Sequence, residues 1–300
     1  MARPSAAPRR PGEPGPSGWL AAPALVMFLA FALVPLAAVV ALSFTRWDGL
    51  GAISFDGLAS WRRALSTPAT GNALWVTAKV MVFSYVVQTP LSLLLGVFTA
   101  GRQRYRAVLA VLYFLPLLLS SAAIAIAFKA LLDPSFGFSA GVGMPALAKN
   151  WLGDPNLALF VVVAVIAWQF VPFHTLIYQG GVRQIPASLY EAAQIDGAGR
   201  VRQFLTITLP QLKYTIITSS TLMAVGSLAY FDLVFVLTAG GPGEATRLLP
   251  LHMYLTGFQA SDMGAASALG VMLVAIGLAV ALLLQRLGGK DRSASQTEGI

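Results

Sequence analysis

Long stretches without a charged side chain constrain this chain more than any other feature of its sequence. No charge stands between Trp19 and Thr45, and none between Asp262 and Arg286. An α-helix rises 1.5 Å per residue, so about twenty apolar residues cross the hydrocarbon core of a bilayer. The pattern therefore predicts an all-α polytopic membrane protein with six transmembrane helices, over residues 20–43, 74–100, 108–131, 157–179, 215–237 and 265–284.

Composition supports the same class. The 300 residues are 57% hydrophobic and only 11% charged, whereas soluble domains are about 25% charged. The chain has no cysteine, which excludes disulfides, thiolate metal sites and cysteine nucleophiles. Its two histidines, His174 and His252, are far apart in sequence, so a site of several histidines is excluded too.

The net charge of +8 is explained by membrane orientation and not by a nucleic-acid partner. If the N-terminus is cytoplasmic, thirteen Lys and Arg fall in cytoplasmic segments and five in outer loops. Cytoplasmic loops carry the excess of basic residues in membrane proteins. We therefore expect a multi-pass protein of the inner (cytoplasmic) membrane with both termini inside. The five outer basic residues are Arg46, Arg62, Arg63, Lys149 and Arg247.

Three regions follow from this pattern. Residues 1–18 are rich in Pro, Gly, Ala and Ser and predict a disordered cytoplasmic tail. Residues 19–287 form the membrane domain, with its longest loop at 180–214, and residues 288–300 form a second cytoplasmic tail. The first apolar stretch has the basic flank of a secretory signal, but its length favours a retained anchor.

The loops carry no recognisable catalytic motif. The sequence lacks a phosphate-binding loop, an H-E-x-x-H pair and a G-x-S-x-G elbow. Any energy for transport must therefore come from an ion gradient or from another subunit.

The loop at 180–214 predicts a short helix–turn–helix on the cytoplasmic face. Pro186 ends the preceding element, and Ser188 with Glu191 fits an S-x-x-E capping box. Asp196-Gly197 is a stop-and-turn signal, with Gly197 suited to a left-handed residue after the helix. A second helix is expected from about Ala198 to Pro210. Such an exposed element is a candidate docking site for a partner.

This loop resembles the "EAA" signature of permease subunits in binding-protein-dependent ABC importers. The matching residues are Glu191, Ala192, Ala193, Asp196, Gly197, Ile207, Leu209 and Pro210. The resemblance implies that the loop inserts into a cytoplasmic ATPase. It also implies two ATPase subunits, a homologous second permease and an extracytoplasmic solute-binding protein. ATP and Mg²⁺ are then expected on the partner subunits, with no cofactor on this chain and no enzymatic activity of its own.

A second resemblance narrows the branch. Phe231-Asp232 and the run Leu237–Gly243 are similar to an outer loop of carbohydrate-type permeases, in particular the compact maltose and glycerol-phosphate group. The resemblance covers about residues 20–287 and implies a sugar or oligosaccharide as solute. A permease for a non-sugar solute and an ion-driven secondary transporter remain alternatives, although secondary transporters usually carry several intramembrane acids.

Polar side chains within the predicted spans are candidates for the solute path, because such groups are costly in lipid unless they face protein or water. Asp232 is the strongest candidate, since it is an acid at span depth. The others also fit interhelical hydrogen bonds. They are Tyr230, Gln88, Gln169, His174 and Tyr178.

Overall fold

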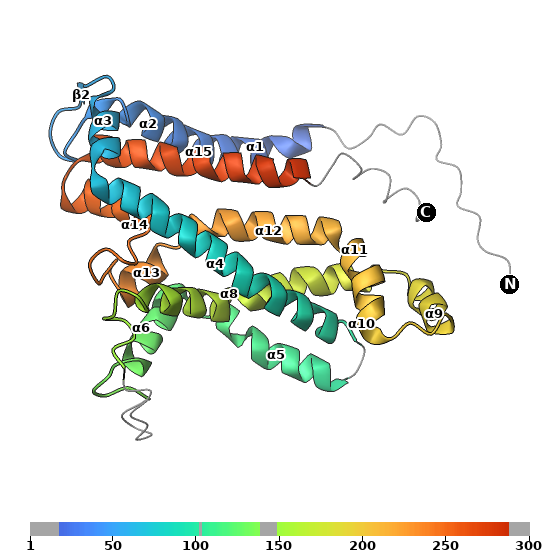
Figure 1. Cartoon of the computed structure of the whole chain (residues 1–300). Coiled ribbons are helices and arrows are strands. Elements are labelled where there is room, and N and C mark those ends of the chain that lie inside the picture. Colours follow the sequence, from blue (N-terminus) through green and yellow to red (C-terminus); the bar gives the residue numbers. More distant parts are fainter. Residues whose placement is uncertain (1–17, 102–103, 139–148, 288–300) are drawn as a thin grey trace.

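Apolar helices running side by side dominate the computed structural model, which describes residues 18–101, 104–138 and 149–287 (Figure 1). Four helices in this part of the chain are long and apolar enough to cross a membrane. The first runs through η1 (Gly18–Ala21), α1 (Ala22–Phe28), the π-helical turn η2 (Leu29–Leu33) and α2 (Val34–Leu42). The others are α4 (Pro68–Thr99), α8 (Ala158–Arg183) and α15 (Met263–Leu287).

The predicted third span is not one straight helix. It is divided into α5 (Arg104–Leu118) and α6 (Ser121–Leu131), which meet at an angle of 102°. Ser120 ends the first run, because its extended backbone lets its hydroxyl accept the N–H of Ala123 and cap a new helix. If this bent pair counts as one span, the described residues contain five.

The predicted fifth span is also interrupted. Helix α12 (Lys213–Ser227) is only 15 residues long, and α13 (Asp232–Leu237) follows after a break. Two backbone hydrogen bonds form a turn at this break: the Leu228 N–H donates to Val225 O, and the Ala229 N–H donates to Gly226 O. The expectation of one continuous helix over 215–237 is therefore wrong.

Helices α4 and α8 form the centre of the bundle. They pack so closely that a Cβ at Gly96 would lie 2.7 Å from the Cβ of Tyr178. The Ser92 hydroxyl donates to Val171 O, and the Thr175 hydroxyl donates to Ser92 O, each at 3.3 Å. Glycine and small hydroxylated residues let membrane helices approach in this way.

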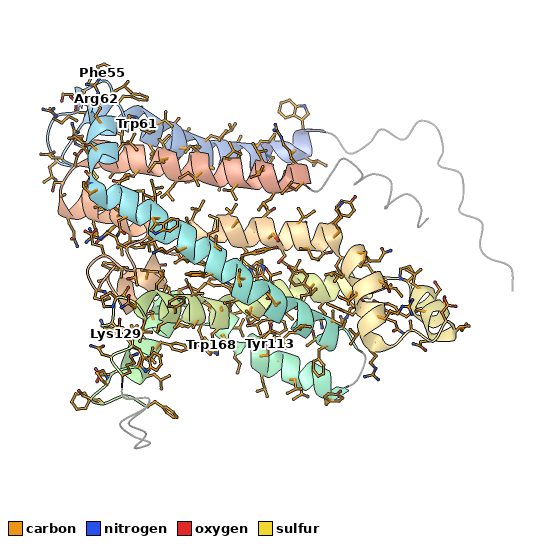
Figure 2. All side chains as sticks on the ribbon, in the orientation of Figure 1. Phe55, Trp61, Arg62, Tyr113, Lys129 and Trp168 are labelled. Atoms are coloured by element: carbon orange, nitrogen blue, oxygen red, sulfur yellow. The ribbon has the colours of Figure 1, made fainter. Side chains whose placement is uncertain are left out.

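One end of the bundle, here called the α3 end, carries the short elements (Figure 1). Strands β1 (Thr45–Arg46) and β2 (Ser54–Phe55) pair antiparallel, with Thr45 opposite Phe55. Phe55, Arg62 and Trp61 are labelled there in Figure 2. The remaining elements of this end are α3 (Ala59–Ser66), α13, α14 (Leu249–Tyr254) and the π-helical turn η5 (Leu255–Gln259).

An arginine ties these elements together. Arg63 lies 2.8 Å from Asp56 and 2.8 Å from Asp262, which precedes α15. The hydrogen bond from Arg63 lowers the pKa of Asp56. Burial alone would raise the pKa of Asp262, but hydrogen bonds from Arg63 and the Ala265 N–H outweigh it and lower that pKa.

The opposite end, here called the α9 end, carries the loop between α8 and α12. Helix α1 begins and α15 ends at this same end (Figure 1). The predicted tails fall almost wholly outside the described residues. The loop elements are α9 (Ala187–Ile195), α10 (Arg200–Gln203), the π-helical turn η4 (Phe204–Thr208) and α11 (Leu209–Gln211).

Candidate coupling loop and buried polar cluster

Helix α9 contains the E-A-A residues and begins differently from expectation. Pro186 occupies the cap position, and its carbonyl accepts the N–H of Leu189 at 3.2 Å. Ser188 therefore lies inside the first turn, and no side chain caps the helix. The predicted capping box between Ser188 and Glu191 is therefore wrong. The Glu191 carboxylate does not cap the helix and is exposed.

The end of α9 matches the prediction. Gly197 has φ +74°, the left-handed conformation that glycine adopts at no steric cost. Its N–H donates to Gln194 O at 3.0 Å, and the Ala198 N–H donates to Ala193 O at 2.8 Å. These two bonds form a Schellman motif, which satisfies the last carbonyls of the helix and fixes the direction of the chain beyond it.

The second half of the loop is a helix with a π-helical turn. It starts at Arg200, passes through η4, which contains Ile207, and reaches Leu209 and Pro210 in α11. A proline removes one backbone N–H, and a wider turn before it accommodates the loss. The Tyr190 hydroxyl lies 2.9 Å from Thr208 Oγ1, so α9 is tied to η4 by a side-chain hydrogen bond.

Helix α9 stands clear of the bundle (Figure 1). None of its residues is buried, and Ile195 is 87% exposed. Glu191, Ala192 and Asp196 are exposed, and Ala193 is half-buried. An exposed helix of small residues with a large apolar side chain at its end has the shape and chemistry of a docking element.

The base of the loop packs into the membrane domain. Leu212, which follows α11, forms a buried cluster with Leu93 of α4 and Tyr178 of α8, and Phe204 and Leu209 pack against it. The base of the loop is therefore in direct contact with α4 and α8.

Four of the six predicted path residues lie in two polar groups where α4, α8 and α12 pack together, and these groups are here called the polar cluster. His174 Nδ1 is 2.9 Å from the Ser219 hydroxyl, and Tyr178 lies beside the same serine. Tyr230 lies beside Gln88 and Ser227. The predicted residues in these two groups, all of them buried, are Gln88, His174, Tyr178 and Tyr230.

Several polar atoms of this cluster lack a partner. Both amide atoms of Gln88, the hydroxyl of Ser84 and the phenol of Tyr178 are buried without a hydrogen bond in the described residues. A buried polar group without a partner costs about 1–3 kcal/mol. Each such group in a native protein needs an explanation, and contact with a bound molecule is one. Sequence reasoning missed Ser84 and Ser219, although Ser84, Gln88 and Ser92 repeat every four residues and so share a helix face.

The other two candidates lie elsewhere. Gln169 Nε2 donates to Ser121 Oγ at 3.0 Å and to Leu119 O at 3.5 Å, so it stabilises the corner between α5 and α6. Asp232 is the exposed first residue of α13 and is not enclosed within a continuous span, contrary to expectation.

An apolar groove of about 740 Å³ lies between α4, α5 and α8. Tyr113 and Trp168, both labelled in Figure 2, line it together with leucines and valines. Within residues 18–101, 104–138 and 149–287, no three His, Cys, Asp or Glu side chains gather closely enough to hold a metal ion.

Sequence relatives cover most of the chain. It is 32% identical to a probable ABC transporter permease protein, YurN, of Bacillus subtilis, over 87% of this chain and 91% of the relative. It is 30% identical to the arabinooligosaccharides transport system permease protein AraP of the same organism, over 89% and 87%. A trehalose/maltose transport system permease protein of Thermococcus litoralis is also 30% identical, over 89% and 91%.

Solved structures share the fold. A bacterial ABC transporter involved in the import of the acidic polysaccharide alginate has a chain with TM-score 0.78 and 21% identity, covering 92% of this chain and 96% of that one. Residues 88–290 match the family described as the inner membrane component of binding-protein-dependent transport systems. The chain belongs to this family of ABC importer permeases.

Proposed function

We propose that this chain is one of two homologous six-span permease subunits of an ATP-driven importer for a sugar or oligosaccharide. The α9 end faces the cytoplasm, where α9 docks on one of two ATPase subunits. These partners bind ATP and Mg²⁺, and the permease itself catalyses no covalent chemistry. An extracytoplasmic solute-binding protein delivers solute at the α3 end.

The observation that carries the coupling proposal is a series of contacts from α9 to the polar cluster, which begins with the hydrogen bond between Tyr190 and Thr208. Tyr178 packs in the apolar cluster with Leu212 at the base of the loop. The same side chain lies beside Ser219 and Thr89 among the polar residues. We infer that a force on α9 reaches the polar cluster through the base of the loop and the Tyr178 side chain.

The polar cluster supports a polar solute. In this structure several of its amide and hydroxyl groups have no hydrogen-bond partner among the described residues. When the path opens, these groups offer donors and acceptors to the hydroxyls of a sugar. Asp232 lies two residues from Tyr230 and is exposed, and we assign it to the wall of the same path. The named functions of the arabinooligosaccharide and trehalose/maltose relatives support a sugar.

Fold alone does not select the solute. A methionine ABC transporter shares this fold with TM-score 0.54 over 77% of the chain. A transport assay therefore has to compare solute classes, and methionine is a suitable non-sugar arm.

Orientation is tested with single cysteines, because the native chain has none. Gln203 lies at the α9 end and Ala245 lies in the loop before α14. In intact cells, an impermeant maleimide should label Ala245→Cys and spare Gln203→Cys. The reverse pattern would overturn the proposed orientation and the docking of α9 with it.

Function is tested in proteoliposomes containing the permease pair, the ATPases and the cognate binding protein. We expect ATP-dependent uptake of at least one of maltose, trehalose and arabinotriose, no uptake of methionine, and no effect of a protonophore. Uptake that requires a proton gradient and not ATP would contradict the proposal.

A further inference from the structure

A second hollow lies at the α3 end, separate from the buried polar cluster. It has a volume of about 610 Å³ and is bounded by the corner between α3 and α4, by α14 with η5, and by the start of α15. Thr70 lines it, and Gln88 lies eighteen residues further along α4. At 1.5 Å per residue the two sites are about 27 Å apart, so one small solute cannot occupy both.

The arginines in this pocket are already neutralised. Arg63 is paired with Asp56 and Asp262. Arg247 Nη1 lies 2.6 Å from Glu244. Neither arginine is therefore available as an unpaired positive charge for an anionic ligand.

His252 is held in one tautomer by its neighbour. The Thr70 hydroxyl donates its single proton to Ala64 O at 2.5 Å. Its 3.0 Å contact with His252 Nε2 must then be one in which Thr70 accepts. Burial lowers the pKa of His252 from its ordinary value of 6.5, which favours the neutral ring. With hydrogen on Nε2, the neutral ring has a lone pair on Nδ1.

Two polar atoms of the lining remain unmatched. His252 Nδ1, an acceptor, and Arg247 Nε–H, a donor, are buried and have no hydrogen-bond partner in the described residues. His252 is only 7% exposed, and both residues line the same pocket. A carboxylate cannot satisfy the acceptor, and an ammonium cannot satisfy the donor. A hydroxyl does both.

We propose that this pocket is an outer subsite for a neutral, hydroxyl-bearing solute, and that small side-chain movements on binding uncover His252 Nδ1 and Arg247 Nε–H, so that the solute's hydroxyls donate to the first and accept from the second. Ala64, Leu255 and Leu269 supply apolar lining for the carbon face of a sugar ring. The inference rests on the proposed sugar substrate and orientation. It adds a second binding position for the solute, outside the membrane path, which the solute occupies before it reaches the buried polar cluster.

The test uses protection of a thiol in the assembled importer in right-side-out vesicles without ATP. Ser66 is exposed and lines the pocket, and Ser54 is exposed on β2 outside it. The labelling rate of Ser66→Cys with an impermeant maleimide is measured with maltose, trehalose, arabinotriose or an acidic alginate oligosaccharide. A neutral sugar that binds with Kd about 1 mM slows labelling about tenfold at 10 mM.

We expect at least one neutral sugar to protect Ser66→Cys, with no protection of Ser54→Cys and none by the alginate oligosaccharide. Protection should be lost when His252→Phe or Arg247→Lys is added and retained with His252→Asn, whose amide oxygen keeps an acceptor. An unchanged labelling rate of Ser66→Cys without sugar shows that each added variant leaves the pocket folded.

Three results would overturn the subsite. They are no protection by any neutral sugar at 50 mM, equal protection by the acidic sugar, or protection that survives both His252→Phe and Arg247→Lys. Uptake of the same sugars by the importer is measured in parallel. Uptake without protection refutes the subsite alone, whereas neither uptake nor protection refutes the sugar assignment as well.

Discussion

Gly197 offers a graded test of the coupling loop, because its surroundings separate backbone strain from packing. A Cβ built at this position meets nothing within 4 Å. Substitution therefore adds no clash, and its cost is the left-handed backbone at φ +74°. For an ordinary L-residue that conformation costs about 1–2 kcal/mol. Asparagine adopts it more readily, and a β-branched residue adopts it least readily.

The expected order of coupling is therefore wild type, Gly197→Asn, Gly197→Ala and Gly197→Val. A cost of about 2 kcal/mol disfavours the observed turn about 30-fold, and α9 then leaves the direction set by its Schellman motif. Because Gly197 makes no tertiary packing contact, the thermal stability of the helix bundle should not change. The loss should appear only in coupling.

The assay is solute-stimulated ATP hydrolysis in proteoliposomes, together with retention of the ATPase during purification in detergent. Gly197→Val should lose stimulation or release the ATPase, and Gly197→Asn should keep both. Wild-type turnover and retention in the valine variant would refute the role of this turn. A lowered melting temperature of the isolated permease would show that the substitution acts on the fold and not on coupling.

The remaining predictions concern packing, pH and the path. Gly96→Ala should destabilise the permease by about 1–3 kcal/mol, because its Cβ would overlap α8; Gly180→Ala, which meets nothing within 4 Å, is the matched control in thermal unfolding. Asp262 has a pKa below its unfolded value, so its stabilisation, about 1 kcal/mol or less, is present above about pH 4 and is lost as pH falls further. The fall in melting temperature between pH 5 and pH 3 should therefore be smaller in Asp262→Asn; an equal fall would contradict this assignment. Asp232→Asn should change the KM or rate of uptake while the complex assembles normally, and failure to assemble would instead indicate a structural role.

The sequence predicted which segments are apolar enough to lie in a membrane. It did not predict which of these segments form a straight helix. Hydropathy measures the cost of contact with lipid, which is the same for a straight and a bent helix. Ser120 sits among apolar residues, and only its extended backbone and its bond to Ala123 show that a new helix starts there. The turn at Gly197 was predictable because it depends on local backbone geometry alone.

For a related reason, only some of the residues of the polar cluster could be predicted from the sequence. Composition marks a polar residue in a span, but tertiary packing decides which face it occupies. Gln88 and His174 meet polar residues in and just after α12 because α12 packs against both α4 and α8. Gln169 is on the same helix as His174, yet it lies beside the end of α5.

The corner between α5 and α6 has a mechanical consequence. Helix α6 has 11 residues and is about 16 Å long, so it is roughly half the thickness of the hydrocarbon core. Backbone groups exposed at such a corner cannot be left to lipid, since each would lose several kcal/mol. Gln169 of α8 meets that requirement, and the Tyr113 hydroxyl of α5 also bonds to Thr175 of α8. We therefore expect α5 and α8 to move together whenever the bundle changes shape.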